Sequence, residues 1–203
     1  IFGEVPAGEA LLRSGARPGD EIWVSGTPGR AALGLAHLQG RIVLAEPQLA
    51  DCLAALHRPQ PRVELGLALR GLATAAIDVS DGLLAALGHI LAASGVAAQL
   101  RLAVSPKGTS SGASPEPTFS DECLLSGGDD YELAFTTPAG RRSEIEALAD
   151  ALPLALTRIG TVETGTPGAI DLRDLDDRPV EVAQRGYDHF MSRRGAGTVS
   201  QDA

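Results

Sequence analysis

Aromatic side chains and positive charge are both scarce in this sequence of 203 residues. Phe, Trp and Tyr together make up 3% of it, so a core has to be built from aliphatic side chains packed between helices and a sheet. The 26 Asp and Glu residues outnumber the 17 Lys and Arg residues, which gives a formal net charge of -9. Because nonspecific binding to nucleic acids needs cations against the phosphates, we expect no nucleic-acid partner.

Long apolar runs are also absent. No run approaches the roughly 20 residues that span a bilayer, and the chain does not open with a basic and then apolar signal peptide. We therefore expect a cytoplasmic protein without a membrane partner. The first residue is not Met, and Ile1-Phe2-Gly3 is typical of the end of a strand, so we also expect further sequence upstream.

Cysteine and histidine do not occur at the spacings of metal sites. Cys52 and Cys123 lie far apart, which favours two ordinary buried thiols over a zinc site or a disulfide framework. The four histidines show no metal-ligand spacing either. GxSxG, P-loop and GxGxxG sequences are missing, so hydrolase, Walker-type and dinucleotide-binding functions have no support.

Apolar periodicity predicts alternating strands and helices. Strands are predicted at 21–25, 73–79, 96–102 and 131–136, and helices at 30–38, 46–56, 63–72, 83–95 and 143–152. A capping box of Ser143 and Glu146 opens the last helix. Short strands joined by hairpin-like turns are predicted at 157–162, 169–172 and 179–182. This order favours an α/β or α+β domain with a mixed sheet layered with helices.

Asp78, Ser80 and Asp81 stand between an apolar strand and the start of the most regular helix. Acidic residues are stabilised at a helix amino terminus and Ser80 can cap it, so an ordinary strand-to-helix turn explains them. A carboxylate at the end of an apolar strand is costly, however, without a cation or hydrogen bonds. Carboxylates suit Mg²⁺, which takes one or two of them together with waters and phosphates. Spacing alone leaves both interpretations open.

The segment Ser-Gly-Gly-Asp-Asp-Tyr-Glu-Leu at 126–133 is a second candidate site. Two glycines let the backbone approach a ligand, and Asp129 with Asp130 can hold a metal or a substrate. Gly-Gly and Gly-Asp are also common turn dipeptides, so a turn before a strand is the better explanation of this segment taken alone.

Arg13 and Arg17 flank a turn near the start of the chain. The guanidinium fork matches phosphate oxygens, so either residue can contact a phosphate. Solvated surface arginines are nevertheless more common.

Four segments of this sequence form an ordered set. They are Leu-Leu-Arg-Ser-Gly-Ala-Arg-Pro-Gly-Asp at 11–20, Ala-Ile-Asp-Val-Ser-Asp-Gly-Leu at 76–83, Leu-Ser-Gly-Gly-Asp-Asp-Tyr-Glu-Leu at 125–133 and Gly-Tyr-Asp-His-Phe at 186–190. Together they resemble the thiamine-monophosphate kinase family, from about Ile1 to Phe190 and over the later two-thirds of that family's sequence. The resemblance implies the carboxyl-terminal fold of the superfamily that includes aminoimidazole ribonucleotide synthetase.

The resemblance also implies an activity and a set of roles. The activity is transfer of the γ-phosphoryl group of ATP to thiamine monophosphate, which gives thiamine diphosphate with Mg²⁺ in the site. No residue is assigned as a catalytic acid or base. The implied contacts are Mg²⁺ at Asp78 and Asp81, ATP at Ser80 and Arg13, and thiamine monophosphate at Asp129, with Tyr187 or Phe190 near its rings.

The resemblance divides the chain into three parts. Residues 1–19 would be the end of a missing amino-terminal ATP-binding domain and its connector, 20–190 the carboxyl-terminal kinase domain, and 191–203 a disordered tail. The missing domain supplies further metal-binding aspartates in the family and usually forms the homodimer interface, so we expect the chain alone to lack measurable kinase activity. Residues 105–120, rich in Ser, Pro and Gly, depart from the family pattern and are expected to form a flexible loop.

Two other functions remain open. One is an ATP-dependent synthetase of the same superfamily, although the segment at 126–133 favours the kinase. The other is a non-catalytic binding module, which the presence of both carboxylate segments disfavours.

Overall fold

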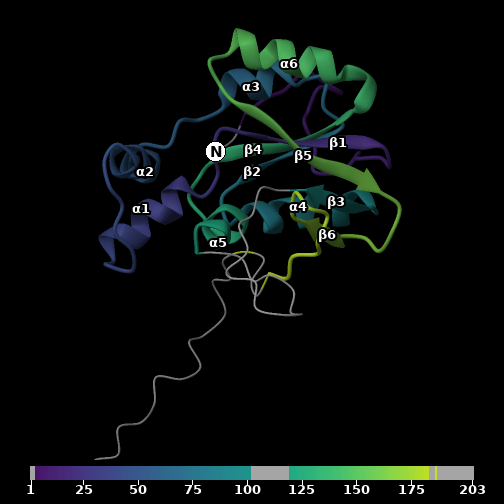
Figure 1. Ribbon diagram of the computed structural model, residues 1–203. Helices are drawn as coiled ribbons and strands as arrows, with labels where there is room; N and C mark the ends of the chain where they lie inside the picture. Colours follow the sequence, from purple (N-terminus) through teal and green to yellow (C-terminus); the bar gives the residue numbers. More distant parts are fainter. Residues whose placement is uncertain (1–2, 102–118, 183–185, 187–203) are drawn as a thin grey trace, which may run out of the picture.

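A mixed six-stranded sheet lies at the centre of the molecule (Figure 1). The structure, a computed structural model, describes residues 3–101, 119–182 and 186. The strand order across the sheet is β2-β4-β1-β5-β3-β6. The strands are β1 (Asp20–Ser25), β2 (Ala75–Val79), β3 (Ala97–Arg101), β4 (Glu132–Pro138), β5 (Leu156–Glu163) and β6 (Ile170–Arg173).

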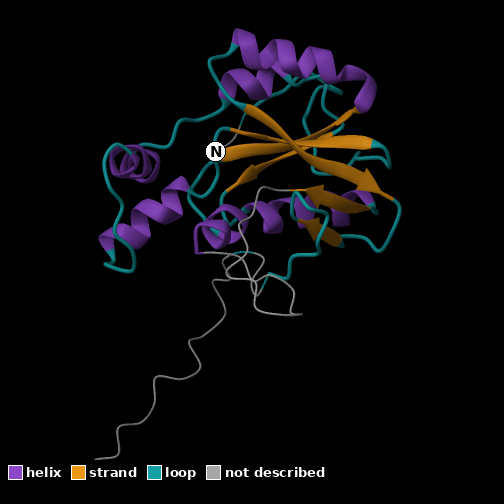
Figure 2. Ribbon diagram, in the orientation of Figure 1, coloured by secondary structure: helices purple, strands orange, loops and turns teal. Residues whose placement is uncertain are grey.

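Helices cover both faces of this sheet, as Figure 2 shows. The helices are α1 (Arg30–Leu38), α2 (Gln48–His57), α3 (Val63–Ala68), α4 (Leu83–Ser94), α5 (Phe119–Ser126) and α6 (Arg142–Ala151). Helices α3 and α6 pack on one face around Phe135, and α4 packs on the other face around Ile22 and Leu87. Helices α1 and α2 pack against each other and lie beside the sheet rather than over its faces (Figure 1). The predicted layered α/β domain with a mixed sheet is confirmed.

Helix α4 is the main support of the core. Leu83, Leu87, Ile90 and Leu91 are fully buried, so the apolar spacing seen in the sequence marks the face that meets the sheet. The helix ends where Gly95 takes a left-handed conformation with φ of 71°, which a glycine adopts without steric cost. The sequence predicted this helix and its end correctly.

The late strands do not form the predicted hairpins. Strand β5 lies between β1 and β3 and is antiparallel to both, and β6 pairs in parallel with β3. Gly160 allows this close pairing, because a Cβ there would lie 2.3 Å from the Gln99 carbonyl oxygen. The predicted strand at 179–182 is reduced to one isolated bridge between Arg173 and Pro179. Burial of β5 inside the sheet outweighs pairing with its sequence neighbour.

Several helix boundaries also differ from the prediction. The capping box is wrong: α6 already begins at Arg142 after a 3₁₀ turn (Ala139–Arg141), so Ser143 lies inside the helix rather than ahead of it. Helix α3 ends at Ala68 instead of residue 72. Helix α5 was not predicted, since its eight residues are too short and polar to show a clear period. It takes in Phe119 and Ser120 from the predicted loop.

Some predictions fall on residues that the structure does not describe. The rest of the predicted loop, the supposed strand end at 1–2 and the tail after Phe190 lie outside the described residues. Within the described part, no helix is long and apolar enough to cross a membrane.

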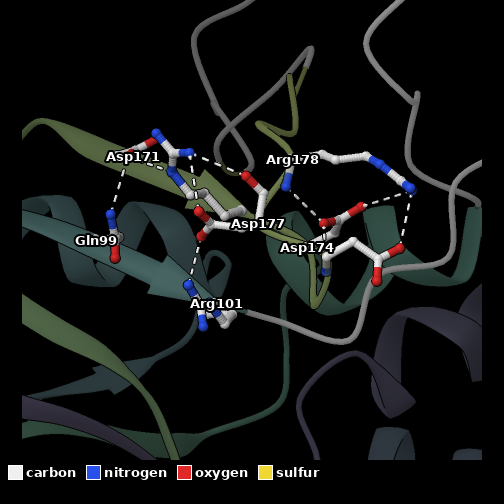
Figure 3. Close-up of polar contacts among 8 residues, drawn as sticks. Gln99, Arg101, Asp171, Asp174, Asp177 and Arg178 are labelled. Atoms are coloured by element: carbon white, nitrogen blue, oxygen red, sulfur yellow. Dashed lines mark hydrogen bonds and ion pairs between the residues drawn. The ribbon is translucent and has the colours of Figure 1, made fainter.

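Charged side chains line the outer edge of the sheet at β6 (Figure 3). Arg173 donates a hydrogen bond to Asp171, and Arg101 on β3 contacts Asp177 at 2.5 Å. Buried Asp174 accepts the backbone N–H groups of Asp176 and Arg178 and so closes the turn after the strand. Charges on an edge strand disfavour the addition of another strand.

Candidate functional site

The two carboxylate segments meet where β2 and β4 end. The backbone N–H of Asp129 donates to the carbonyl oxygen of Ser80 at 2.8 Å, and the N–H of Tyr131 donates to Val79 at 2.9 Å. These bonds continue the antiparallel pairing of the two strands beyond Val79 and Glu132. Segments about 50 residues apart in the sequence therefore form one pair of loops.

Glycines make this approach of the loops possible. A Cβ on Gly128 would lie 2.8 Å from the Ser80 carbonyl oxygen, and a Cβ on Gly82 would lie 2.9 Å from the Ser126 carbonyl group. Gly82 also has a φ of 117°, which side chains rarely adopt. Gly128, which suggested an ordinary turn in the sequence, and Gly82 are both needed where the two loops meet.

A third sequence segment reaches the same place. A Cβ on Gly186 would lie 2.8 Å from the Asp81 carbonyl oxygen and 2.6 Å from Ala85. The structure thus places the start of the segment 186–190 against the Asp78–Asp81 loop. Tyr187 and Phe190, the predicted contacts to the substrate rings, lie outside the described residues.

Three carboxylates are presented to solvent by these loops. Asp78, Asp81 and Asp129 are all exposed, and the Ser80 hydroxyl lies 3.5 Å from an Asp81 oxygen. The predicted burial cost of Asp78 is therefore wrong, because Asp78 is the exposed position of the otherwise buried strand β2. Ser80 does not cap α4 either, since the capping position is occupied by Gly82.

A cleft of about 670 Å³ opens beside Asp78. Its walls include Arg13, Arg62 and Tyr131, so both a predicted ATP contact and a predicted Mg²⁺ ligand face the same space. Arg13 reaches the cleft because the carbonyl of Leu12 accepts the N–H of Ala76 at 2.8 Å on the free edge of β2. Ser80, Asp81 and Asp129 are not among its lining residues.

The two adjacent aspartates of the second segment have separate surroundings. While Asp129 is exposed, Asp130 is 8% exposed and accepts the backbone N–H groups of Gly29 at 2.6 Å and Ala31 at 3.3 Å. It therefore caps α1 from a distant part of the chain. Burial raises the pKa of Asp130 to about 6, partly opposed by these hydrogen bonds and by the positive charge of Arg30.

Glu132, at the start of β4, connects this strand to Ser25 of β1 and to Arg62. Its carboxylate accepts two hydrogen bonds of 2.6 Å from the guanidinium of Arg62 and one of 2.6 Å from the Ser25 hydroxyl. Gly26 leaves room for this carboxylate, because a Cβ there would overlap it. Arg62 lines both the large cleft and a smaller cavity of about 300 Å³, and Glu132 lines the smaller one.

Comparison with known proteins agrees with this arrangement. Residues 17–172 match the family described as AIR synthase related protein, C-terminal domain. The chain belongs to this family.

Within this family, the chain is similar to thiamine-monophosphate kinases. The chain is 46% identical over 193 residues to the thiamine-monophosphate kinase of Escherichia coli K12, which covers 95% of this chain and 59% of that protein. The crystal structure of thiamine-monophosphate kinase from Stenotrophomonas maltophilia superposes with a TM-score of 0.70 at 40% identity, over 83% of this chain and 54% of that one. A structure of AaThiL complexed with AMPPCP and TMP gives a TM-score of 0.66 at 30% identity, over 89% and 54%. This chain thus spans little more than half the length of the relatives it matches.

The oxygen donors of this AIR synthase related domain suit a hard cation. Asp78 near the end of β2 and Asp81 in the loop that follows offer exposed carboxylates, and Mg²⁺ commonly takes one or two such ligands with waters and phosphates. Within residues 3–101, 119–182 and 186, no group of three or more His, Cys, Asp or Glu side chains could hold a metal ion. The donors fit Mg²⁺ bound together with a phosphorylated ligand better than an ion held by the protein alone.

The two cysteines of the domain are buried free thiols, as predicted. Burial raises the pKa of Cys123 to about 11 and also raises the pKa of Cys52. A thiolate is therefore disfavoured near neutral pH, and neither residue is suited to nucleophilic chemistry.

The sequence did not reveal the roles of Asp130, Glu132 and Arg62. Asp130 and Glu132 are also acidic, but they point into the protein where Asp129 points to solvent, and each is paired with a residue far away in the sequence. Arg62 follows Pro61 in a segment without periodicity, so nothing local signalled its ion pair across 70 residues.

Proposed function

We propose that this chain is the carboxyl-terminal part of a kinase that transfers the γ-phosphoryl group of ATP to thiamine monophosphate. The observation that carries this proposal is the hydrogen bond between Asp129 and Ser80, which brings a predicted substrate contact next to a predicted ATP contact. Identity of 46% to a thiamine-monophosphate kinase supports the substrate, and the complex of AaThiL with AMPPCP and TMP supports a site for both ligands.

The proposed roles follow the positions of the side chains. Asp78 and Asp81 would hold Mg²⁺ against the ATP phosphates, and Arg13 would contact those phosphates from the wall of the cleft that it shares with Asp78. Ser80 would hydrogen-bond ATP, and Asp129 would contact the thiamine phosphate. Tyr187 and Phe190 stay proposed neighbours of the thiamine rings.

The chemistry asks mainly for positioning and charge neutralisation. Both reactants carry phosphate, so the transferring group and its acceptor repel each other in the absence of cations. Bound Mg²⁺ would supply the neutralising charge. The exposed carboxylates fix where that charge lies, and Arg13 adds a guanidinium at the cleft wall. No side chain has to accept a covalent bond in this reaction.

The proposal includes parts that lie beyond this chain. The amino-terminal domain would complete the ATP and Mg²⁺ ligands, and the longer protein would form a homodimer in the cytoplasm. The share of 59% of the length of the Escherichia coli relative leaves room for such a domain. The division at residues 19 and 190 is part of the same proposal, although residues 12–16 already contact β2 and α4.

Isothermal titration of the 203-residue chain tests the substrate assignment. Thiamine monophosphate and thiamine diphosphate would each be titrated with and without Mg²⁺, into the unchanged chain and into Asp129→Ala. We expect saturable binding that Asp129→Ala weakens by about tenfold, or about 1.4 kcal/mol. Asp150→Ala, which alters an exposed carboxylate on α6, serves as the matched control and should bind normally. Equal binding by Asp129→Ala would refute the assigned role.

A further inference from the structure

Residues 129–131 alternate between solvent and core in an unusual backbone. Asp129 and Tyr131 have φ values of 68° and 53°, the left-handed region that residues other than glycine rarely adopt. Both are exposed, while Asp130 between them is 8% exposed. Such a conformation persists only where surrounding contacts impose it.

Asp130 supplies the contact that imposes it. Its two carboxylate oxygens separately accept the N–H groups of Gly29 and Ala31, so the side chain is fixed at both oxygens. With Asp130 pulled inward, its two neighbours must point outward. The N–H groups of these neighbours then meet the carbonyls of Ser80 and Val79.

The partner of Asp130 is itself rigidly placed. Gly29 caps α1 in a left-handed conformation and has no side chain that could bind the free N–H groups of the helix. A Cβ on Gly29 would lie 2.7 Å from the backbone nitrogen of Leu124 in α5, so the start of α1 is pressed against that helix. The start of α1 thus offers a fixed anchor to Asp130.

We propose that Asp130 is a positioning residue of the substrate site, which anchors to the amino terminus of α1 and thereby directs the Asp129 carboxylate outward beside the Ser80 loop. This inference rests on the proposed function for the substrate that Asp129 meets. The geometric part, control of the loop by Asp130, stands without any ligand.

The buried position of Asp130 carries an electrostatic cost. Burial raises the pKa of Asp130, so its charge is unfavourable where it sits. The nearby charged groups are Glu132, which adds to this cost, and Arg30, which reduces it. A capping side chain on an exposed turn would satisfy the same N–H groups without this desolvation cost.

Hydrogen exchange of the ligand-free chain tests the geometric part. In Asp130→Ala, the amides of Asp129 and Tyr131 should exchange at least about tenfold faster relative to those of β1, because the segment that carries them is no longer anchored to the start of α1. In Asp130→Asn, which keeps one acceptor oxygen and the side-chain size, exchange should stay within about threefold of the original chain. Unchanged exchange in Asp130→Ala, or an equal acceleration at every amide, would overturn the inference.

Asp174→Ala is the matched control for this experiment. Asp174 is also buried and also accepts two backbone N–H groups, but it closes the turn after β6. Its replacement should accelerate exchange at Asp176 and Arg178 and leave the amides of Asp129 and Tyr131 unaffected. Acceleration at Asp129 in this control would show a general loss of stability and would contradict the inference.

A double-mutant cycle links the geometry to the substrate. Asp130→Ala should weaken thiamine monophosphate binding in the presence of Mg²⁺ by about tenfold, yet by less than about twofold when Asp129 is already alanine. Equal losses in both backgrounds would mean that Asp130 does not act through Asp129. If the unchanged chain binds no thiamine monophosphate, the proposed function fails, whereas the exchange experiment still decides whether Asp130 positions the loop.

Discussion

The backbone N–H of Asp129 lies 2.8 Å from the carbonyl oxygen of Ser80 and donates a hydrogen bond to it. This bond fixes the spacing between two loops that each carry exposed carboxylates. Each loop alone resembles an ordinary turn, but together they concentrate negative charge beside a cleft that also contains Arg13. Such a surface attracts cations, and bound cations allow a phosphorylated ligand to approach.

Gly128→Ala should weaken both the fold and the site. The added Cβ would lie 2.8 Å from the Ser80 carbonyl oxygen, so the loops must separate. We expect a loss of about 1–3 kcal/mol in the free energy of unfolding, measured by urea denaturation. Gly140→Ala is the control, because a Cβ there meets no atom within 4 Å. Equal stability of the two variants would show that the loops do not need this contact.

Asp130→Asn should change how stability depends on pH. The folded-state pKa of Asp130, about 6, lies above its unfolded value of about 3.9, so the protonated carboxyl stabilises the fold at low pH. That contribution is fully present below about pH 4 and is lost as the pH rises through 6.

The unchanged chain should therefore lose on the order of 2–3 kcal/mol relative to Asp130→Asn between pH 4 and pH 7.5. Urea denaturation of both proteins across this range measures the difference. Parallel pH profiles would contradict the raised pKa.

Arg62→Met should destabilise the chain by about 3 kcal/mol, because the Glu132 carboxylate stays buried without its main counter-charge. Adding Glu132→Gln should recover part of the loss, since the remaining group is then neutral. Arg101→Met is the control: its ion pair with Asp177 is exposed and should be worth less than about 1 kcal/mol. Thermal and urea unfolding measure all three. A loss for Arg62→Met no larger than the control's would rule out a structural role for the buried pair.

Local periodicity predicted most of the helices and strands, but it did not predict which strands pair with each other. Helix α4 was clear because Leu83, Leu87 and Ile90 repeat at helical spacing and all face the sheet. The place of β5 between β1 and β3 depends on pairs that are more than 100 residues apart for β1 and 60 or more apart for β3, which no short window of sequence contains. The predicted capping box is wrong because a 3₁₀ turn leads directly into α6, which begins before Ser143.

The residues of the candidate site were likewise predictable from local sequence, but their contacts with distant residues were not. Asp78, Ser80, Asp81 and Asp129 were selected from sequence segments, and the structure joins those segments through the Ser80 carbonyl. The capping role of Asp130 could not be read from the sequence, because its partner Gly29 lies about 100 residues away.

The chain alone should show no measurable kinase activity. The proposed function assigns further Mg²⁺ ligands to the amino-terminal domain, and we expect that without them too little Mg²⁺ is bound to neutralise two phosphorylated reactants. An assay for ADP formation from ATP, thiamine monophosphate and Mg²⁺ checks this expectation. Turnover that Asp78→Ala abolishes would mean that the chain holds a complete site.

Amide chemical shifts in the 203-residue chain test the central claim, that the two loops form one binding site. Thiamine monophosphate would be added in the presence of Mg²⁺ while the signals of residues 76–83 and 125–133 are followed by NMR. We predict saturable shifts in both segments with one shared dissociation constant, and none in the turn at 174–178. Shifts confined to one segment, or absent from both at millimolar ligand, would contradict it.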